Sequence, residues 1–427
     1  MTLQKYMMDR KEDIKNIEVK PRATELSPSK NFITAVIGPR RAGKTYSLYE
    51  FIQKNRLNDD EYLFVNMEDY EVKTSGRENV AQCVAIHTET YGCEPAYIFL
   101  DEVQGMEKWN NWVYSLYEKK RYNIVVTGST SKHLSKEIAT ELRGRTITVR
   151  IFPFSFKEFL TIMGFDLKKN YTTNEEAKIR NLLRTYLKSG GYPDVLLGHI
   201  QPEKFFREYI DLTTYRDIVE RYEIKNLFLI KFMINSVISS YSSEFSINKI
   251  YNSLKANHIK VSRKTLYTYF TYLYDAMFVF PLRKYSRSLR KMMLARPKIY
   301  INDTGIINSI TPSGSEEIGR MMENTVFLEL ERRKDAMPLM ESYYWKDASG
   351  REVDFVVKEG NNIKELIQVS YAEGRDGVES REIDNLLIAD IELKARKLTV
   401  ITWSYEGTVE FGKKTIHFIP LWKWLLL

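Results

Sequence analysis

The chain has 427 residues, of which 43% are hydrophobic and 13% aromatic, so it can form two or three packed domains. Its two cysteines, Cys83 and Cys93, exclude a disulfide framework and a cysteine-rich zinc site, and they fit a reducing cytoplasm. The net charge is +8, and no apolar run approaches the ~18 residues that cross a membrane, which predicts a cytoplasmic protein with no membrane partner.

The first segment of the chain, residues 1–30, combines both signs of charge with no periodic apolar pattern. It begins “MTLQKYMMDRKEDIKN”, which contains acids and lacks the apolar centre of a signal peptide. A composition of this kind is typical of chain that does not pack into a core. We therefore expect ordered structure everywhere except in this segment.

A phosphate-binding loop follows. The stretch “FITAVIGPRRAGKTYSLYEFI” predicts a strand over 32–37, a loop and a helix, with Gly-x-x-x-x-Gly-Lys-Thr between strand and helix. The glycines let backbone N–H groups approach phosphates, Lys44 neutralises the β- and γ-phosphate oxygens, and the Thr45 hydroxyl binds Mg²⁺. The predicted ATP-binding residues are Gly38, Pro39, Arg40, Arg41, Ala42, Gly43, Lys44, Thr45 and Tyr46.

The second half of such a site is an acid at the end of a buried strand. A strand over 97–100 leads to Asp101, a predicted Mg²⁺ ligand, and to Glu102, predicted to polarise the attacking water. The next apolar run, “YNIVVTGST”, ends in Thr127 and Ser129, and a polar side chain at this strand tip can reach the γ-phosphate. With strands also predicted over 62–69 and in “TITVRIFPF”, five strands alternate with helices. The fold class is therefore α/β, with a parallel sheet and the nucleotide at its carboxyl edge.

These motifs resemble the AAA+-like P-loop ATPases of archaea and bacteria that carry a C-terminal domain of PD-(D/E)XK nuclease-like fold. The resemblance covers nearly the whole chain and is carried by “GPRRAGKT”, “LDEVQ”, “VTGST”, “ELRGR”, “FPFSFKEFL”, “GGYP”, “PKIYINDTGI”, “ENTVFLELERR” and “REVDFVV”. It implies that Thr127 or Ser129 is the sensor residue, and that Arg143 or Arg145 is an arginine finger for a neighbouring subunit. A homo-oligomer, a ring or an arc formed with ATP, then becomes obligatory. The alternative for each arginine is that it only caps the helix before the fifth strand.

The resemblance implies four domains. They are a P-loop ATPase core (1–160), a helical lid (161–235), a winged helix-turn-helix module (236–297) and a PD-(D/E)XK nuclease-like domain (298–427). A helix of the lid ends in the turn Gly190-Gly191-Tyr192-Pro193, which approaches the nucleotide in the family. On its own, this turn is a helix C-cap.

The third domain carries a concentrated excess of positive charge. Segment 245–296 contains eleven basic residues and one acid, Asp275, which favours a polyanionic partner. Two helices are expected there, followed by a strand in “MFVFPLRKYSRSLRKM” that forms the wing. The alternative is that this module only joins domains or contacts other subunits. The candidate DNA contacts are Arg263, Lys264, Tyr267, Arg283, Lys284 and Arg287.

The last domain has the element order of a nuclease fold. We expect a helix carrying Glu323, a hairpin ending in Asp354, and a strand with Gln368 and Ser370 on one face. Active members need two carboxylates for the metal and a lysine that stabilises the transition state. Gln368 brings no charge and Ser370 cannot act as a cation, so the sequence predicts a degenerate site without cleavage.

Three hypotheses follow. The first is an oligomeric ATPase that uses ATP and Mg²⁺ and binds or remodels DNA, with branched DNA among the candidates. The second is an ATP-dependent assembly switch with slow hydrolysis and a protein partner. The third is an ATP-gated, metal-dependent nuclease. Glu102 and the candidate arginine fingers favour hydrolysis, the charge of 245–296 favours DNA, and Gln368 and Ser370 disfavour cleavage.

Overall fold

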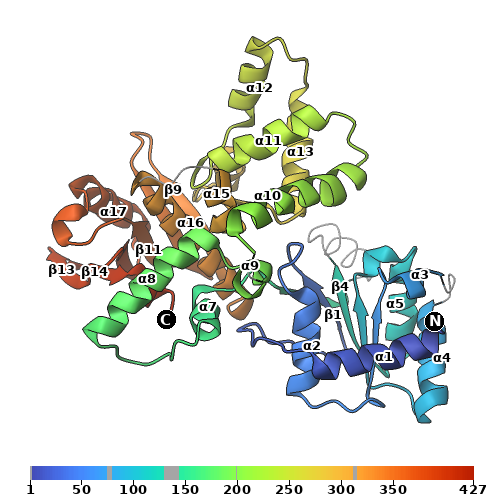
Figure 1. The fold of residues 1–427 in the computed structure, drawn as a ribbon. Helices are drawn as coiled ribbons and strands as arrows, with labels where there is room; N and C mark the ends of the chain where they lie inside the picture. The colour runs from blue at the N-terminus through green and yellow to red at the C-terminus, as the bar shows by residue number, and fades with distance from the viewer. Residues whose placement is uncertain (1, 75–78, 129–143, 199, 311–314) are drawn as a thin grey trace. The chain divides into compact units, whose positions relative to one another are not determined.

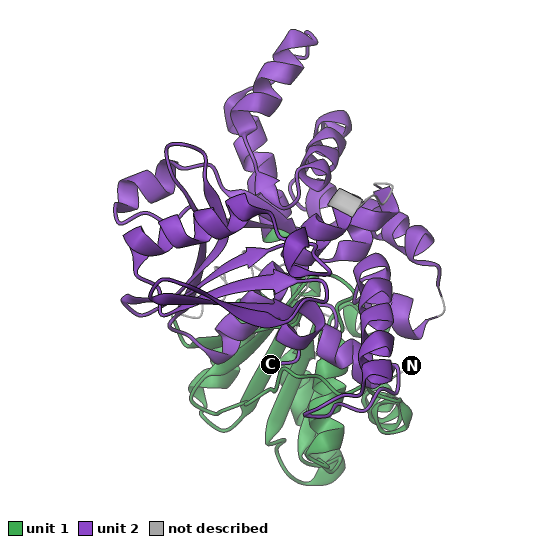
Figure 2. Ribbon diagram, turned by 90° about the vertical axis from the view of Figure 1, so that its left-hand side faces the viewer, with its two compact units in different colours: residues 1–152, 275–277 green, residues 153–274, 278–427 purple. Residues whose placement is uncertain are grey.

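The computed structural model describes residues 2–74, 79–128, 144–198, 200–310 and 315–427. The chain folds into two compact units, which Figure 2 shows in green and purple. Unit 1 contains residues 1–152 and 275–277, and unit 2 contains residues 153–274 and 278–427. Each unit has its own architecture and is described by itself.

Unit 1 is built on a five-stranded sheet in the order β2-β3-β4-β1-β5, in which every pair of neighbours is parallel (Figure 1). Parallel strands of this kind are apolar on both sides because helices cover both faces. The five strands and their parallel direction confirm the sequence-based prediction. They are β1 (Ile33–Ile37), β2 (Tyr62–Asn66), β3 (Tyr97–Asp101), β4 (Asn123–Gly128) and β5 (Thr146–Arg150).

Alternate residues of these strands enter two separate cores. Ile33, Ala35 and Ile37 of β1 pack in one core with side chains of α1, α4 and α5. Val36 packs on the other face, in the core that receives the apolar side of α2. The period of two along each strand thus places helices on both faces. The helical segments of unit 1 are α1 (Leu3–Asn16), α2 (Lys44–Lys54), α3 (Tyr70–Thr74), α4 (Asn79–Tyr91), η1 (Val103–Gly105) and α5 (Trp109–Glu118).

The first segment of the chain is ordered, so the expectation of no regular structure over residues 1–30 is wrong. Helix α1 buries Leu3, Tyr6, Met7 and Ile14, which recur at helical spacing on one side. The Thr2 hydroxyl accepts a hydrogen bond from the Lys5 N–H and caps the helix. The apolar stripe is short and interrupted by charged residues, and for that reason the mixed composition conceals it.

Unit 2 begins with helices that correspond to the predicted lid. Its Gly190-Gly191 turn is enclosed by other parts of unit 2: the Gly191 N–H donates to the Asp303 carboxylate at 2.7 Å, and its carbonyl accepts from the Phe154 N–H. A Cβ atom at Gly191 would lie 2.2 Å from the Phe154 carbonyl oxygen, so only glycine fits. These helical segments are α7 (Phe156–Ile162), α8 (Thr173–Ser189), α9 (Pro193–Leu197), α10 (Pro202–Leu212), the π-helix η2 (Thr213–Glu220) and α11 (Leu227–Ser239).

A small antiparallel sheet in the order β6-β8-β7 follows α11. The segment predicted to form the wing is not one continuous strand, because β7 ends at Leu282. The next residues, Arg283 and Tyr285, form backbone hydrogen bonds with Tyr344. A short helix, α14, then precedes β8. Pairing with Tyr344 ends the β7 ladder, because these backbone groups now bond to another strand. The elements are β6 (Ser243–Glu244), α12 (Ile247–Ala256), α13 (Arg263–Asp275), β7 (Val279–Leu282), α14 (Leu289–Leu294) and β8 (Lys298–Ile301).

The rest of unit 2 is a six-stranded mixed sheet in the order β13-β14-β12-β11-β10-β9. The predicted order of helix, hairpin and neighbouring strand is confirmed by α16, β9, β10 and β11. The elements are α15 (Thr304–Ile310), α16 (Ser315–Ala336), β9 (Met340–Lys346), β10 (Glu352–Glu359), β11 (Asn362–Val369), η3 (Arg375–Gly377), α17 (Ser380–Leu393), β12 (Lys397–Thr402), β13 (Gly407–Phe411), β14 (Lys414–Pro420) and α18 (Leu421–Trp424).

Candidate functional site

The predicted phosphate-binding loop joins β1 to α2 at the carboxyl edge of the unit 1 sheet. Gly38 lies against the end of β5, and a Cβ atom there would be 2.1 Å from the Ile151 carbonyl oxygen. Gly43, directly before α2, has φ of 99°, a conformation that favours glycine. Both glycines of the motif are therefore required by the backbone, and the loop leads into the amino end of a helix, where anions bind.

The rest of the loop is mostly enclosed. Pro39 and Ala42 are buried, whereas Arg40 is half-buried, and Arg41 and Tyr46 are exposed. Arg41 has φ of 61°. The loop therefore contains a second residue in the left-handed region, and this one is not a glycine. The predicted binding residues thus form one continuous turn from 38 to 46.

Lys44 and Thr45 are the first residues of α2 and point toward β3. The Lys44 ammonium is buried and donates to the carbonyl oxygens of Gly38 and Pro39, each at 3.2 Å. The Thr45 hydroxyl donates to the carboxylate of Asp101 at 2.9 Å. The sequence-predicted lysine, hydroxyl and acid are therefore brought together at one sheet edge.

Asp101 is fully buried at the end of β3 and is held by three neighbours. Besides Thr45, the Thr127 hydroxyl donates to it at 2.6 Å and the Asn66 side-chain amide at 3.3 Å. Burial, together with the adjacent charge of Glu102, raises the pKa of Asp101 to about 6. A carboxylate with this pKa still ionises near neutral pH, and a bound cation would stabilise the ionised form.

Glu102 follows Asp101 with φ of 49°, which is unusual for a residue with a side chain. Its N–H donates to the Thr127 hydroxyl. One carboxylate oxygen lies 4.0 Å from the Lys44 ammonium, and the other accepts a hydrogen bond from the Gln104 amide at 2.6 Å. The carboxylate is therefore held beside the loop lysine, where the predicted base belongs.

The donor groups at this edge fit Mg²⁺. Mg²⁺ prefers oxygen ligands and is usually bound by one or two protein groups together with phosphates and water. The Thr45 hydroxyl and the Asp101 carboxylate, 2.9 Å apart, supply such groups. Over the ranges that the structure describes, no three His, Cys, Asp or Glu side chains are grouped closely enough to hold a metal by themselves. A metal at this edge would need a phosphate ligand as well.

The predicted sensor and finger residues are only partly described. Thr127 lies at the strand tip, but its hydroxyl is fully buried between Asp101 and Glu102. Ser129 and Arg143 lie outside the described residues. Arg145 directly precedes β5, and its guanidinium contacts the Tyr114 hydroxyl at 3.1 Å and the Glu118 carboxylate.

Arg145 lies at the edge of the sheet opposite the phosphate-binding loop. The Ile33 N–H donates to the Arg145 carbonyl, so this arginine is level with the first residue of β1. The loop begins after Ile37, at the other end of the same strand. Because β1 and β5 are parallel, the Arg145 side chain is remote from the nucleotide edge of its own subunit.

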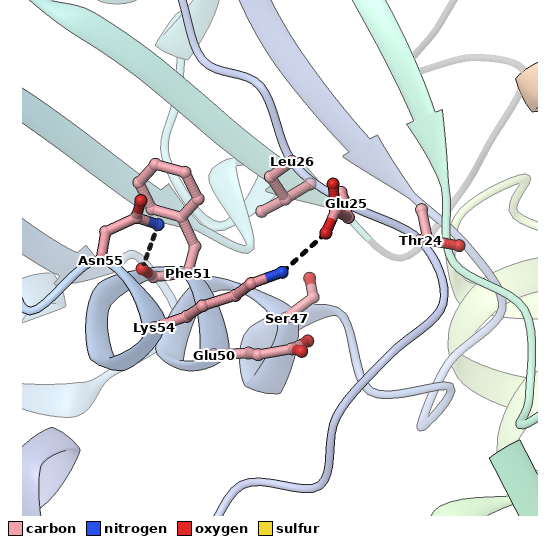
Figure 3. Close-up of a pocket in the computed structure, with 8 residues that line it drawn as sticks. All are labelled: Thr24, Glu25, Leu26, Ser47, Glu50, Phe51, Lys54 and Asn55. Carbon is pink, nitrogen blue, oxygen red and sulfur yellow. Dashed lines mark hydrogen bonds and ion pairs between the residues drawn. The ribbon is translucent and has the colours of Figure 1, made fainter.

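A separate cavity of about 260 Å³ lies between residues 24–26 and one face of α2 (Figure 3). Lys54 and Glu25 form an ion pair of 2.6 Å across it, and the Glu50 carboxylate accepts from the Arg22 N–H. None of residues 38–46 lines this cavity. It is therefore distinct from the phosphate-binding loop.

The basic module exposes part of its predicted contact surface. Arg263, Lys264 and Tyr267 are exposed on the first turns of α13, and the Arg263 guanidinium lies over the Tyr251 ring. Arg283, Lys284 and Arg287 follow β7, and the Arg287 guanidinium donates to the Glu392 carbonyl. Of the six predicted DNA contacts, only Arg263, Lys264 and Tyr267 lie together on one helix.

A second acidic cluster lies in unit 2, where the degenerate nuclease site was predicted. Glu323 of α16 and Asp354 of β10 do come together, but a lysine lies between them. The Lys298 ammonium is 2.6 Å from Glu323, 2.9 Å from Glu352 and 3.0 Å from Asp354. Lys298 is the first residue of β8 and is almost completely buried.

The other two predicted residues border this cluster. The Gln368 side-chain oxygen accepts from the Asp354 N–H at 3.4 Å, and the Val369 N–H donates to the Asp354 carboxylate at 3.0 Å. Ser370 hydrogen-bonds to Glu382, whose pKa is raised to about 7, chiefly by burial. Neither Gln368 nor Ser370 supplies a charge, as the sequence indicated.

Sequence reasoning missed residues at both sites. Asn66 ends β2 beside Asp101, and a polar residue at the end of a neighbouring parallel strand could have indicated it. Glu352 shares a strand with Asp354 at a spacing of two, which also predicts a common face. Lys298 lies 25 and 56 residues from Glu323 and Asp354 in the sequence, and no local pattern indicates it.

Comparison with protein families divides the chain into three matches. Residues 30–160 match a family model described as AAA domain, which contains the parallel sheet and the loop. Residues 180–317 match “Domain of unknown function (DUF8612)”, and residues 318–424 match “Domain of unknown function (DUF4143)”. Among the described residues, no helix combines the length and apolar character needed to cross a membrane.

Two curated relatives span almost the whole chain. The “Uncharacterized protein MJ1544” of Methanocaldococcus jannaschii is 36% identical over 99% of this chain and 95% of its own length. An “Uncharacterized protein” of Haemophilus influenzae is 26% identical over 93% of this chain and 94% of its own.

Among solved structures, the Aeropyrum pernix ORC1 protein in complex with DNA matches with a TM-score of 0.31 and 11% identity, covering 72% of this chain and 92% of that one. Cdc6p of Pyrobaculum aerophilum matches with a TM-score of 0.25 and 15% identity, covering 58% of this chain and 80% of that one.

Proposed function

Because the chain belongs to the family of AAA-domain proteins that includes Methanocaldococcus jannaschii MJ1544, we propose that it is an oligomeric, Mg²⁺-dependent ATPase that binds or remodels DNA. The observation that carries the ATPase part is the group formed by Lys44, Thr45, Asp101 and Glu102. Thr45 and Asp101 are in direct contact, and Lys44 lies beside Glu102. The remaining parts of the proposal rest on the charge and position of other residues.

ATP binding is supported by the loop itself. Its backbone bends at Gly38 and Gly43 so that N–H groups at the start of α2 can approach phosphate oxygens. Lys44 is bonded to carbonyl groups of the same loop, and its ammonium can exchange these bonds for phosphate oxygens. Mg²⁺, when bound, neutralises charge on the phosphates. Thr45 and Asp101 would hold it, and Thr127 and Asn66 orient the Asp101 carboxylate.

Hydrolysis is supported by Glu102. A general base must lie within hydrogen-bond reach of the water that it activates. The left-handed backbone of Glu102 and its contact with Gln104 fix the carboxylate at the sheet edge, beside the loop lysine. Glu102 therefore accepts the proton of the attacking water, while Thr127 holds its backbone N–H.

A neighbouring subunit would complete the site. Because Arg145 lies at the opposite edge of the sheet, it can act on a nucleotide only in another copy of the chain. The test is to mix a Lys44→Ala chain with an Arg145→Ala chain, each inactive alone. If Arg145 acts between subunits, mixing restores part of the phosphate release, since some interfaces then pair an intact loop with an intact arginine. Failure to restore activity, with both variants still assembling, would contradict this role.

DNA binding is supported by the module from α11 to β8. Its order of α11, β6, α12, α13 and the antiparallel strands β7 and β8, with α14 between these two strands, supports the interpretation of the module as a winged helix. Its second and third helices are those that contact DNA in such modules. Arg263, Lys264 and Tyr267 are exposed on α13. Segment 245–296 contains eleven basic residues and only one acidic residue. Such an excess favours a phosphate backbone as partner.

The experiment for this part is a double charge reversal, Arg263→Glu with Lys264→Glu. We expect DNA affinity to fall at least ~10-fold and the slope of log affinity against log salt to decrease by about two, because each lost phosphate contact removes about 0.9. Lys204→Glu with Arg207→Glu, on the exposed side of α10, changes the net charge equally and serves as the matched control. Equal losses in both variants would mean that only net charge matters, and the module would not be the DNA site.

A further inference from the structure

The acidic cluster of unit 2 already contains a cation. The Lys298 ammonium is within 3.0 Å of a carboxylate oxygen from each of Glu323, Glu352 and Asp354. An ammonium has three N–H donors, so each donor has its own carboxylate. Almost no solvent reaches this lysine, whose side chain is 3% exposed.

The cluster lies on three elements of unit 2. Lys298 comes from β8 of the small sheet, Glu323 from α16, and Glu352 and Asp354 from β10 of the large sheet. The second oxygen of Glu352 pairs with Lys346 at 2.9 Å, and Lys346 pairs with Glu244 of β6 at 3.0 Å. Alternating charges therefore connect the small sheet to the large one.

The carboxylates of this cluster also accept hydrogen bonds from groups other than lysines. The Tyr300 hydroxyl donates to Glu323 at 2.7 Å, and the Val369 N–H donates to the second oxygen of Asp354. Although burial alone would lower it, the pKa of Lys298 is raised well above its usual value by Glu323 and its other neighbours. The lysine is thus charged throughout the neutral range.

We propose that Lys298 is a permanent cation of the chain that takes the place of a divalent metal between Glu323, Glu352 and Asp354, whose carboxylates, as they lie around the ammonium, do not form a metal-binding group. Three carboxylates around one small cation are also the ligands of a hard divalent metal such as Mg²⁺ or Mn²⁺. With the ammonium present, a metal would have to displace a buried charge that is bonded on three sides. The cluster therefore ties the two sheets together and does not bind metal.

This inference extends the sequence-based prediction that the degenerate site does not cleave DNA, and it adds Lys298 to Gln368 and Ser370 as a reason for that prediction. It makes a prediction that those two residues alone do not make. Removing the lysine side chain should leave three carboxylates around an open space, and a metal should then bind. The test uses neither ATP nor DNA, so its failure would leave the proposed ATPase untouched.

The experiment measures Mn²⁺ binding by the loss of the free-ion EPR signal, on the full chain without nucleotide. Wild type, Lys298→Ala and Lys298→Ala with Asp354→Asn are compared, because the loop of unit 1 is the same in all three. We expect one additional Mn²⁺ per chain in Lys298→Ala, and none in wild type or in the double variant. Thermal unfolding of Lys298→Ala should shift upward with Mn²⁺, while wild type does not shift.

A chain lacking Lys298 carries unpaired buried carboxylates and is at risk of not folding. Lys298→Ala with Glu323→Gln removes one of those charges and retains Glu352 and Asp354 as ligands, so it should bind Mn²⁺ more weakly than the single variant. Folded variants that bind no more Mn²⁺ than wild type would overturn the proposal. So would Mn²⁺ binding by wild type that disappears in Asp354→Asn, a measurement that needs no Lys298 variant.

Discussion

Each unit of the molecule contains a buried lysine beside carboxylates, and the two groups use it differently. In unit 1, the Lys44 ammonium bonds to two carbonyl oxygens of its own loop and stays 4.0 Å from Glu102, while Asp101 is held by hydroxyl and amide groups. In unit 2, the Lys298 ammonium bonds directly to three carboxylates. In the first arrangement the lysine bonds to neutral groups, and in the second one ammonium bonds to three carboxylates.

The difference shows that residue composition alone does not decide whether an acidic group can bind a ligand. In unit 2 the space between the carboxylates is already filled by a buried ammonium that bonds to all three, so a second cation would have to displace it. Charges separated by neutral hydrogen bonds, as at Asp101, can accept a cation when it arrives. The structure therefore supports ligand binding at unit 1 and a connecting role at unit 2.

The largest effect is expected from replacing each lysine by methionine, which keeps most of its volume. Lys298→Met leaves the buried carboxylates of Glu323 and Asp354 without their cation, while Glu352 keeps its pair with Lys346, so the free energy of unfolding of unit 2 should fall by ~3–5 kcal/mol. Lys44→Met, the matched control, removes only two hydrogen bonds to carbonyl oxygens and should cost about 1–2 kcal/mol in unit 1. Urea unfolding followed by a probe in each unit measures both.

The effects of the two substitutions on ATP binding should be the reverse of their effects on stability. Lys44→Met should abolish ATP binding, whereas folded Lys298→Met should bind ATP as wild type does, because its cluster lies in another unit. Equal losses of stability in the two variants would contradict the proposed difference between the surroundings of Lys44 and Lys298. A loss of ATP affinity in Lys298→Met alone would contradict it as well.

A smaller effect is expected from pH. Burial raises the pKa of Asp101 to about 6, and protonated Asp101 cannot hold a cation. Phosphate release should therefore fall about tenfold for each pH unit below 6, with the midpoint lowered where Mg²⁺ is saturating. A rate profile from pH 5 to 8 at two Mg²⁺ concentrations measures this. A profile that ignores Mg²⁺ would mean that another group titrates.

The pH dependence of the stability contributed by Asp101 is opposite to the pH dependence of the activity. Its folded-state pKa lies above the unfolded value, so the folded chain binds this proton more tightly. The contribution is fully present below the unfolded pKa and is lost as the pH rises through about 6. Loss of activity at pH 5 therefore does not reflect unfolding of this group, and circular dichroism at that pH checks the difference.

The candidate site of unit 1 could be predicted from sequence because its signals are local. Gly38, Gly43 and Lys44 lie within seven consecutive residues, and Asp101 ends a strand that can be recognised by its apolar run. A parallel sheet brings the carboxyl ends of its strands to one edge, so the convergence of these residues follows from the strand order. The position of Arg145 at the opposite edge follows from the same reasoning.

The rest could not be predicted because it depends on contacts between distant segments. Lys298 reads as an ordinary basic residue before a strand, and only the tertiary structure brings it to Glu323. Helix α1 was missed because its four buried apolar residues are diluted by charge. The expected wing was misread after Leu282, because pairing of the following residues with Tyr344 of β9 leaves no local signal.

The central claim is that Lys44, Thr45, Asp101 and Glu102 form one ATP-hydrolysing site. Its most direct test is single-turnover phosphate release by wild type and by Glu102→Gln, with ATP affinity measured on the same samples. The account predicts unchanged ATP affinity and a rate lowered by ~10²–10⁴-fold in Glu102→Gln, because only the general base is lost. Phosphate release at the wild-type rate by the variant would contradict it.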